Sequence, residues 1–387
     1  MEFELSEELK MIQSLTRDFV NEQLKPLERD ILGRAADLSD SRTYLPSEIE
    51  EKLIKMAIDM GLWGASIPEE FGGGDLGVLA NCLIEEELAQ TVIPFNLGNV
   101  TPILFDCNTE QRKKYLLPVI NRQKQAYLAL MEPGGNTELS SMKMKFVKKN
   151  DCYVLNGKKI SFSRTSEDYF AIVFAAAEEG GGVSCLLVDK NTPGFTVTGG
   201  QEKTGWQSQI KEPLLLNFEN CHLTAENVLG DKGKAFSLGK KWLPVRRIIR
   251  AARCIGVARR LLEESTIRAE SWESFGQVIS QRVSVEAALA DIAMFIHAGQ
   301  LMTYEAAWKA DNGEIKPSET ALLKLFSNQV LRSVSDQVAH IYNGPPYIAG
   351  LPIEQLCRQA LATSSTDFAL ELQRNIIVKD ILKGVKI

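Results

Sequence analysis

The sequence predicts an α+β protein in three parts. These are a helical N-terminal domain (residues 1–122), a small β-barrel or sandwich (123–232) and a four-helix bundle (233–387). The first third repeats apolar residues at spacings of three and four, which is typical of helices. The middle carries short β-prone runs between turn signals, and the last third carries long helical patterns with short links. A chain of 387 residues has room for two or three such units.

Composition excludes several classes of function. The net charge of −6 argues against a nucleic-acid-binding protein. The seven cysteines are scattered without a Cys-x-x-Cys motif, so we expect reduced thiols and a cytoplasmic protein. The three histidines lie far apart, and we expect no metal site. There is no signal-peptide pattern and no run of about 18 apolar residues, so we expect no membrane span.

Helices are expected throughout the first segment. Ser6 is a candidate N-cap, and Leu9, Ile12, Leu15 and Phe19 would form one apolar helix face. Further helices are expected after Pro46 up to a C-cap at Gly61, over 75–90, and over 109–121 with Thr109 as its cap.

The run Gly72-Gly73-Gly74-Asp75-Leu76-Gly77 matches the G-x-G-x-x-G pattern of dinucleotide-binding loops. That pattern carries meaning only when a strand precedes it and a helix follows. The preceding Ile67-Pro68-Glu69-Glu70-Phe71 is a poor strand, so the run is interpreted as a loop before a helix.

The middle segment reads as a series of short strands. They are expected over 127–131, 153–155, 159–162, 170–175, 183–188, 195–197 and 214–218. Turn signals lie at Asn150-Asp151, at Asn156-Gly157 and at Gly180-Gly181-Gly182. The last segment is expected to hold helices over 234–265, 283–310, 318–340, 352–361 and 366–383.

This layout and several local motifs resemble the acyl-CoA dehydrogenase family. The motifs are Ile67-Pro68-Glu69-Glu70-Phe71-Gly72-Gly73, Glu132-Pro133-Gly134-Gly135, Tyr153-Val154-Leu155-Asn156-Gly157-Lys158-Lys159, Phe275-Gly276 and Tyr304-Glu305-Ala306-Ala307-Trp308. The resemblance implies FAD as cofactor, α,β-desaturation of an acyl-CoA, an electron-transfer flavoprotein or similar acceptor, and a homo- or hetero-oligomer (dimer or tetramer). In that chemistry a carboxylate removes the α-proton and the β-hydride passes to flavin N5, while the protein supplies orientation and electrostatics.

The resemblance places the catalytic base at Asp367, where the family usually has glutamate. Aspartate is one methylene shorter, and a general base must first be within hydrogen-bond reach of its proton. The alternative is that Asp367 is a carboxylate stabilised by a helix N-terminus. A second base position used by some family members matches Arg246, which cannot act as a base.

The resemblance also implies a set of FAD contacts, several of them altered in this chain. The positions are Leu130, Met131, Thr137, Ser161, Ser163, Phe275, His340, Gly344 and Ala369. Met131 replaces the threonine that starts the family's flavin loop, Ser161 replaces an aromatic residue, and Ser163 keeps the hydroxyl that reaches N5. Trp272 replaces the arginine that pairs with the FAD pyrophosphate, a strong charge-assisted contact. His340 is alternatively a packing residue.

One stretch of the last segment is rich in arginine. Arg246, Arg250 and Arg253 share one helix face, with Arg259 and Arg260 further along. They would contact CoA or FAD phosphates, or pair with acids such as Glu263 and Glu264. Arg247 matches a family arginine near the CoA site and is the candidate substrate-binding residue.

The sequence therefore predicts an FAD-dependent acyl-CoA dehydrogenase. The alternative is a diverged, catalytically weak or inactive subunit of a heteromeric acyl-CoA dehydrogenase. Another flavin reaction that uses an aspartate base, such as nitroalkane oxidation, is a third possibility whose wider pattern is not evident in this chain.

Overall fold

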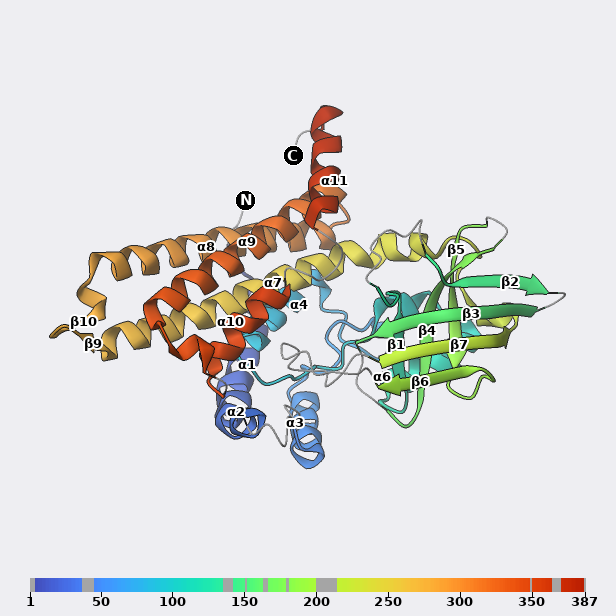
Figure 1. Cartoon of the computed structure of the whole chain (residues 1–387), viewed down its shortest axis with the longest axis horizontal. Helices are drawn as coiled ribbons and strands as arrows, with labels where there is room; N and C mark the ends of the chain where they lie inside the picture. Colours follow the sequence, from blue (N-terminus) through green and yellow to red (C-terminus); the bar gives the residue numbers. More distant parts are fainter. Residues whose placement is uncertain are drawn as a thin grey trace. The chain divides into compact units, whose positions relative to one another are not determined.

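The computed structural model folds into two compact units (Figure 1). It describes residues 4–36, 45–134, 142–149, 152–162, 166–178, 181–199, 214–348, 350–363 and 370–385, without the side chains of 34–36, 239–241 and 361–363. The helical unit comprises residues up to 97 and from 244 onward, and the β unit comprises 98–205 and 209–243. The N- and C-terminal helical segments of the sequence thus contribute to one unit.

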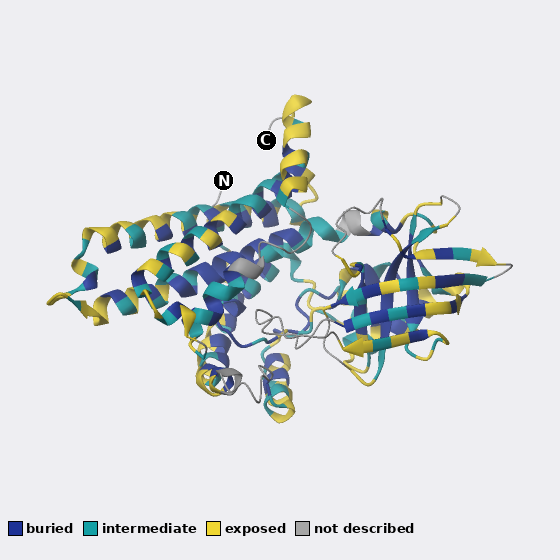
Figure 2. Ribbon diagram, in the orientation of Figure 1, coloured by how far each residue is buried: buried dark blue, intermediate teal, exposed yellow. Residues whose placement is uncertain are grey.

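In the part of the β unit that the structure describes, the strands form one sheet of eight. These are β1 (Gln125–Ala129), β2 (Lys145–Lys149), β3 (Cys152–Ser161), β4 (Tyr169–Ala177), β5 (Val183–Asp189), β6 (Phe195–Gly199), β7 (Leu214–Leu223) and β8 (Val228–Leu229). The order is β6-β7-β3-β2-β4-β5-β8, and β1 pairs with β4 in parallel. Strands β4 and β5 are buried along almost their whole length, as Figure 2 shows. Their continuous apolar runs fit burial on both faces.

The predicted turn at Asn156-Gly157 is wrong. Two expected short strands are one strand, β3, which runs through this point and pairs with β7 on both sides of an irregularity between Leu155 and Gly157. Gly157 has φ of 141°, and an added Cβ would lie 2.9 Å from Cγ of Met144. Glycine suits this position because of the positive φ and the close Met144 side chain, at a shift of register within the strand rather than at a hairpin.

Short helices precede the sheet. They are the 3-10 turn Pro102–Asp106, α5 (Thr109–Gln111), the π turn Arg112–Leu116 and α6 (Leu117–Ile120). A further 3-10 turn, Ala225–Asn227, lies between β7 and β8. The N-cap of α5 is Asn108 and not Thr109, because Asn108 and Gln111 form a reciprocal capping box. The amide of Gln111 also donates to the carbonyl oxygens of Glu226 and Val228, both at 2.8 Å, which ties α5 to the end of the sheet.

Within its described residues, the N-terminal part of the helical unit holds four helices. They are α1 (Glu7–Phe19), α2 (Glu28–Ala36), α3 (Ser47–Asp59) and α4 (Gly77–Leu88), with a π turn at Val20–Leu24 and 3-10 turns at Lys25–Leu27 and Glu69–Phe71. The cap at Ser6 is confirmed, since its hydroxyl accepts from the N–H of Leu9. A 3-10 turn, not a strand, precedes the glycine run, and Gly73 packs on the carbonyl of Ile67. The loop interpretation of that run is confirmed.

The C-terminal part of the helical unit contains the long helices. They are α7 (Ala235–Ser271, in this unit from Pro244), α8 (Val283–Asp311), α9 (Pro317–Tyr342), α10 (Pro352–Thr363) and α11 (Leu370–Leu382). A hairpin of β9 (Glu273–Ser274) and β10 (Gln277–Val278) and a 3-10 turn at Ile279–Gln281 join α7 to α8, and another 3-10 turn, Pro345–Tyr347, follows α9. Residues of α7, α8, α9 and α10 share one apolar core.

Arginines of α7 pair with acids inside the helical unit. Arg253 contacts Glu85 at 2.7 Å, and Arg259 contacts Glu86 at 2.7 Å. Arg260 binds Glu28 at 3.1 Å and Glu264 at 2.7 Å. For these three arginines the ion-pairing alternative is confirmed, although most of the acids come from α2 and α4.

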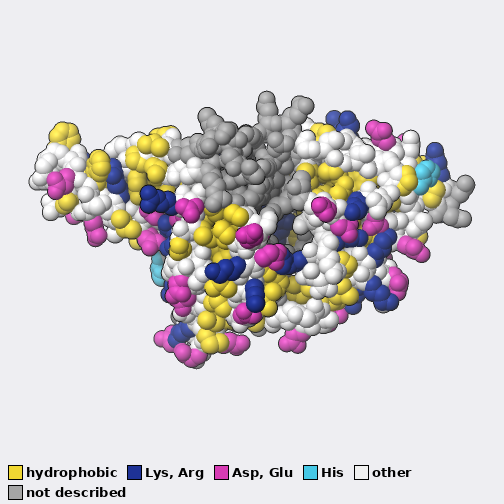
Figure 3. Space-filling model, turned by 90° about the horizontal axis from the view of Figure 1, so that it is seen from below, with side chains coloured by type: hydrophobic (Ala, Val, Ile, Leu, Met, Phe, Trp, Pro, Cys, Tyr) yellow, Lys and Arg dark blue, Asp and Glu magenta, His cyan; other side chains and the backbone are white. Residues whose placement is uncertain are grey.

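Helix α8 is the one described helix long and apolar enough, by composition, to cross a bilayer. Core helices of globular proteins pass the same test, so this is weak evidence for a span. On the face shown in Figure 3, hydrophobic side chains alternate with charges of both signs.

We predict that Gly256→Ala destabilises the helical unit by about 1–3 kcal/mol, the usual effect of overpacking. An added Cβ would lie 2.1 Å from the carbonyl oxygen of Glu86 on α4, so α4 and α7 must separate. Thermal unfolding followed by circular dichroism measures the change. The matched control is Gly33→Ala in α2, where no atom lies within 4 Å and we expect no loss of stability. Equal melting temperatures for the two variants would contradict the close helix contact.

Candidate functional site

The chain leaving β1 continues along the end of β3. Met131 forms an antiparallel bridge with Ile160, and the N–H of Ile160 donates to the carbonyl of Met131 at 2.8 Å. In this register Leu130 lies opposite Ser161 and Glu132 lies opposite Lys159. Because successive side chains alternate between faces, Glu132 and Lys159 share one face while Met131 and Phe162 share the other.

A buried ion pair holds this segment in place. The Lys159 side chain is fully buried, and its Nζ lies 3.1 Å from Oε1 of Glu132 and 3.0 Å from the carbonyl oxygen of Leu130. The Glu132 carboxylate also accepts the N–H groups of Met144 at 2.8 Å and Lys143 at 2.9 Å. One carboxylate thus connects the segment after β1 to the approach to β2 and to β3.

Burial and hydrogen bonding oppose each other in this pair. Burial alone would raise the pKa of Glu132, but the two backbone N–H groups and Lys159 together hold its pKa below the ordinary value. Burial lowers the pKa of Lys159, and Glu132 opposes that effect. A buried charge is tolerated only when it is paired and hydrogen-bonded. The pair therefore depends on both partners being present.

The opposite face of the same segment is exposed and apolar. Met131 is 43% exposed and Phe162 is 42% exposed, both high for large apolar side chains. Gly134 follows with φ of 98° and no atom within 4 Å of an added Cβ. Ser161, by contrast, is buried, and Leu130 is half-buried. The segment presents an open apolar ledge of Met131 and Phe162, on the face opposite to that of Ser161.

The predicted catalytic base and three of the predicted cofactor contacts lie outside the described residues. They are Thr137, Ser163, Asp367 and Ala369.

In the helical unit, Phe275 stands at the tip of the β9–β10 hairpin. Phe275 and Gly276 have φ of 53° and 75°, as in a type I′ turn. A bulky residue with positive φ is strained, and the Phe275 side chain is nevertheless 99% exposed. Strained residues cluster at functional sites, so this ring is a candidate contact for a flat ligand.

Guanidinium groups flank the aromatic residues of the hairpin. Arg268 lies over the ring of Trp272 at 3.5 Å and near that of Tyr342 at 5.6 Å. Arg282 lies 5.6 Å from the ring centre of Phe275. Through Arg268 and Tyr342 the structure brings the base of the hairpin close to the end of α9. Positive charge is therefore present beside Trp272, although the family arginine is not.

The other predicted cofactor and substrate contacts lie in different environments. His340 is 82% exposed with Asp336 at 4.0 Å, so its interpretation as a packing residue is wrong. Gly344 accepts the N–H of Tyr347 at 3.0 Å as Pro345–Tyr347 forms its short turn. Arg247 is buried on α7, with 8% of its surface exposed.

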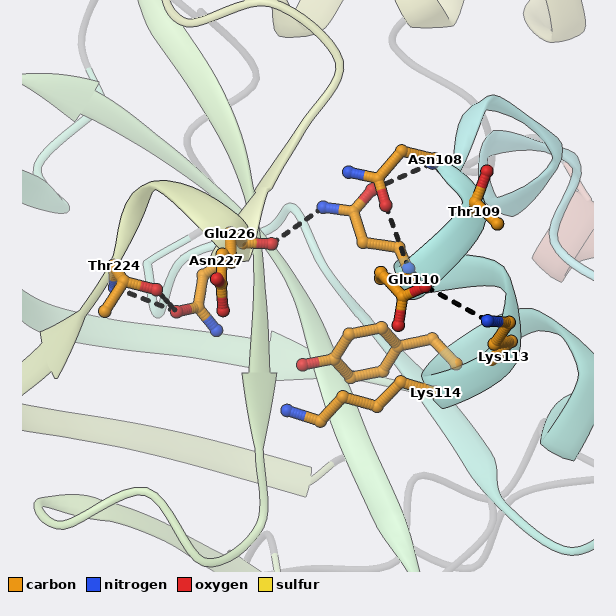
Figure 4. Close-up of a pocket in the computed structure, with 10 residues that line it drawn as sticks. Asn108, Thr109, Glu110, Lys113, Lys114, Thr224, Glu226 and Asn227 are labelled. Atoms are coloured by element: carbon orange, nitrogen blue, oxygen red, sulfur yellow. Dashed lines mark hydrogen bonds and ion pairs between the residues drawn. The ribbon is translucent and has the colours of Figure 1, made fainter.

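The β unit also has an open polar pocket of about 810 Å³ (Figure 4). Asn108, Glu110 and Lys113 face it from one side, and Thr224 and Glu226 from the other. Tyr115 also lines it, and burial, together with Asp189, raises the pKa of Tyr115 to about 12; the Tyr115 hydroxyl donates to Asp189 at 2.9 Å. Of the interactions that Figure 4 draws, the hydrogen bond from the Gln111 amide to the Glu226 carbonyl joins α5 to the Ala225–Asn227 turn, and the others are local to each of these two segments.

Comparison with known proteins identifies the family. Residues 6–123 match the family described as "Acyl-CoA dehydrogenase, N-terminal domain", 128–220 match the middle domain, and 234–382 match the C-terminal domain. The chain belongs to the acyl-CoA dehydrogenase family and has its fold.

Two curated relatives cover nearly the whole chain. Isobutyryl-CoA dehydrogenase of Dictyostelium discoideum is 31% identical over 98% of this chain and 90% of its own length. Short-chain specific acyl-CoA dehydrogenase of Rattus norvegicus is 28% identical over 99% and 92%. These relatives and the family indicate an oxidoreductase of the acyl-CoA dehydrogenase type.

Solved structures agree on the fold. Butyryl-CoA dehydrogenase from Megasphaera elsdenii has a TM-score of 0.82 and 25% identity, covering 99% of this chain and all of its own. A putative acyl-CoA dehydrogenase from Mycobacterium abscessus has a TM-score of 0.89 at 22% identity, with the same coverage. A structure described as the FAD complex of PigA has a TM-score of 0.83 at 22% identity, covering both chains fully.

Sequence reasoning missed three residues of this site: Glu132, Lys159 and Phe162. Glu132 and Lys159 both lie within motifs that carried the family resemblance, but the spacing of 27 residues gives no signal that they pair. The sequence places Phe162 at the end of an expected strand, and nothing in its local pattern indicates that its ring is exposed.

We predict that Glu132→Gln weakens the β unit locally by about 3 kcal/mol, because it leaves the Lys159 ammonium buried without its counter-charge. Hydrogen exchange of the β3 amides should accelerate about 100-fold. The control is Glu110→Gln, which removes an exposed pair with Lys113 and should change exchange by less than tenfold.

Lowering the pH should also weaken the β unit, because it protonates Glu132. The pKa of Glu132 in the folded protein lies below its value near 4.5 in the unfolded chain. The ionised Glu132 therefore contributes its full stabilisation to the folded β unit above about pH 4.5. This stabilisation is lost as the pH falls through the native pKa, so wild-type β3 should lose protection there faster than Glu132→Gln does. Parallel pH profiles for the two proteins would contradict the ion pair.

Proposed function

We propose that this chain is an FAD-dependent acyl-CoA dehydrogenase that introduces a double bond between the α- and β-carbons of an acyl-CoA thioester. The observation that carries the proposal is the succession of all three family domains along 6–382. The segment 130–134, held by the Glu132–Lys159 pair, supports it by presenting its apolar side chains in a fixed geometry.

The described residues suit a flavin cofactor. The exposed ledge of Met131 and Phe162 offers apolar surface to a planar ring system, and Gly134 leaves room for close approach. In the helical unit, the exposed ring of Phe275 suits stacking, and Arg268 and Arg282 suit phosphate groups. Bound FAD would supply the acceptor for the β-hydride.

Asp367 is the proposed base that takes the α-proton of the substrate. Hydrogen bonds to the thioester carbonyl would stabilise the charge that develops there, as in an oxyanion hole. Ser163 is the proposed hydroxyl at flavin N5, and Thr137 is the proposed hydroxyl of the cradle. Leu130, Ser161, His340, Gly344 and Ala369 complete the proposed cofactor positions, and Arg247 the proposed CoA contact.

We place the reaction in the cytoplasm with an electron-transfer flavoprotein or a similar carrier as acceptor. The scattered, unpaired cysteines support a reducing compartment.

We predict that the purified chain carries a flavin absorbance band that bleaches when an acyl-CoA substrate is added without an acceptor. Asp367→Asn should keep the band and slow bleaching about 10²–10⁴-fold, the usual contribution of a general base. Stopped-flow absorbance measures both. Glu371→Gln, an exposed acid on α11, is the control and should bleach normally. A colourless protein that cannot be reconstituted with FAD would refute cofactor use, and undiminished bleaching in Asp367→Asn would refute the base.

We also propose that the chain is a homo-oligomer that packs through α8 and α11. Met294, Leu301 and Trp308 recur every seven residues on α8 and are 47–58% exposed. Leu372, Val378, Ile381 and Leu382 are exposed on α11. A seven-residue apolar repeat is typical of a helix that packs along another helix, and here a second copy of the chain is the occupant.

We predict that the double variant Leu301→Glu/Trp308→Glu has a lower assembly mass than the wild type, because two charges would be buried without partners. Light scattering after size exclusion measures the mass. The control Ile58→Glu alters a comparably exposed apolar residue on α3 and should leave the mass unchanged. A monomeric wild type, or a double variant of unchanged mass, would refute this surface.

A second candidate, a diverged subunit of a heteromeric dehydrogenase, is favoured by Trp272 at the position of the pyrophosphate arginine and by Pro345-Pro346 after Gly344. In that case flavin would be retained only when a partner dehydrogenase is co-expressed. Flavin content of the chain purified alone and with the partner distinguishes the two.

A further inference from the structure

The seven cysteines divide sharply by environment. Five are buried: Cys82, Cys107, Cys185, Cys221 and Cys254. Burial raises the pKa of each, to about 12 for Cys107 and about 11 for Cys254. Since the thiolate is the reactive form of a cysteine, these five are inert. Cys152 and Cys357 are the partly accessible thiols.

Cys152 has a histidine beside it. It is the first residue of β3, and His222 lies on the neighbouring β7, where it pairs with Val154. Sγ of Cys152 lies 3.7 Å from Nδ1 of His222 and 3.1 Å from the carbonyl oxygen of Lys149. The thiol proton thus has two acceptors within reach, and the imidazole accepts it when Nδ1 is unprotonated.

One lysine lies on the same face of the sheet as this pair. The exposed Lys149 lies directly opposite Cys152 in the β2–β3 ladder, and directly opposite residues share a face. Lys148 lies opposite Tyr153, and Nζ of Lys232 lies 5.2 Å from the centre of the Tyr153 ring, so both belong to the other face. Partial exposure, a histidine and a neighbouring lysine form the kind of environment in which cysteines react. The lysine also attracts anionic reagents.

We propose that Cys152 and His222 form a thiol-modification site that reacts with anionic low-molecular-weight disulfides. The Cys152 thiol gives its proton to Nδ1 of His222, and the thiolate attacks one sulfur of the small disulfide. The reagent's S–S bond breaks as the new S–S bond to Cys152 forms. The leaving thiolate takes the proton back from the imidazolium, so Cys152 is oxidised and half of the reagent is reduced.

The site is separate from the flavin-binding segment. Ser161, at the other end of β3, lies nine residues away, or about 30 Å along an extended strand. Modification at Cys152 therefore leaves Met131, Glu132 and Lys159 untouched, and the proposal stands whether or not the chain binds FAD.

Cys357 is the internal comparison. It is also partly accessible, but burial raises its pKa, and Ser335 rather than a histidine is its hydrogen-bonding neighbour. The two thiols therefore differ in the presence of a nearby base and of Lys149.

The experiment treats the purified full-length protein with glutathione disulfide at pH 7.5 and follows adducts by peptide mass spectrometry. We expect the adduct on Cys152 to form at least tenfold faster than on Cys357 within the same molecules. Reaction with Cys357 first, or at an equal rate, would overturn the proposal without reference to any variant.

Two variants separate the parts of the site. His222→Gln should slow the Cys152 adduct about tenfold and leave the slow rate at Cys357 unchanged, which also reports that the fold is intact. Cys152→Ser should abolish the fast adduct. An unchanged rate at Cys152 in His222→Gln would remove the histidine from the site.

Discussion

The Glu132–Lys159 ion pair is the interaction on which the proposed cofactor site depends. A fully buried ammonium is costly unless a counter-charge and hydrogen bonds compensate for lost hydration. Glu132 supplies that charge and uses its remaining capacity to bind the N–H groups of Met144 and Lys143. Lys159 in turn binds the carbonyl of Leu130. Because one face of the segment is fixed in this way, Met131 and Phe162 can remain exposed on the other.

The helical unit also buries a carboxylate and compensates for its lost hydration with an ion pair and hydrogen bonds. Glu86 is fully buried, and burial is the main reason that its pKa is raised. Its carboxylate is bound by Arg259 at 2.7 Å, by the Gln300 amide at 2.7 Å and by the Tyr304 hydroxyl at 2.9 Å. These contacts join α4, α7 and α8. Arginines that the sequence offered as phosphate ligands are thus partly committed to stability, while Arg268 and Arg282 remain beside the aromatic hairpin.

Periodicity in the sequence predicted the helices and most strands because burial imposes it locally. The cap at Ser6 and the loop at 72–77 followed from rules that act within a few residues. The predicted turn at Asn156-Gly157 was wrong because the same dipeptide occurs both in turns and in β-bulges. The pairing of β3 with β7, which the sequence does not show, determines that a bulge forms here. The pairing of Glu132 with Lys159 depends on a register set by tertiary structure, so composition and spacing could not predict it. Met131 and Phe275 were found through family motifs, whereas Phe162 needed its exposure to be seen.

The most direct test of this account is the dissociation constant of FAD, titrated by flavin fluorescence in a double-mutant cycle of Glu132→Gln and Lys159→Met. If the pair orders the cofactor segment, each single variant should weaken FAD binding at least tenfold. The double variant should lose less FAD-binding free energy than the two single variants lose together, because the two partners act as a unit. FAD affinity that is unchanged in both single variants, with the fold intact, would contradict the account.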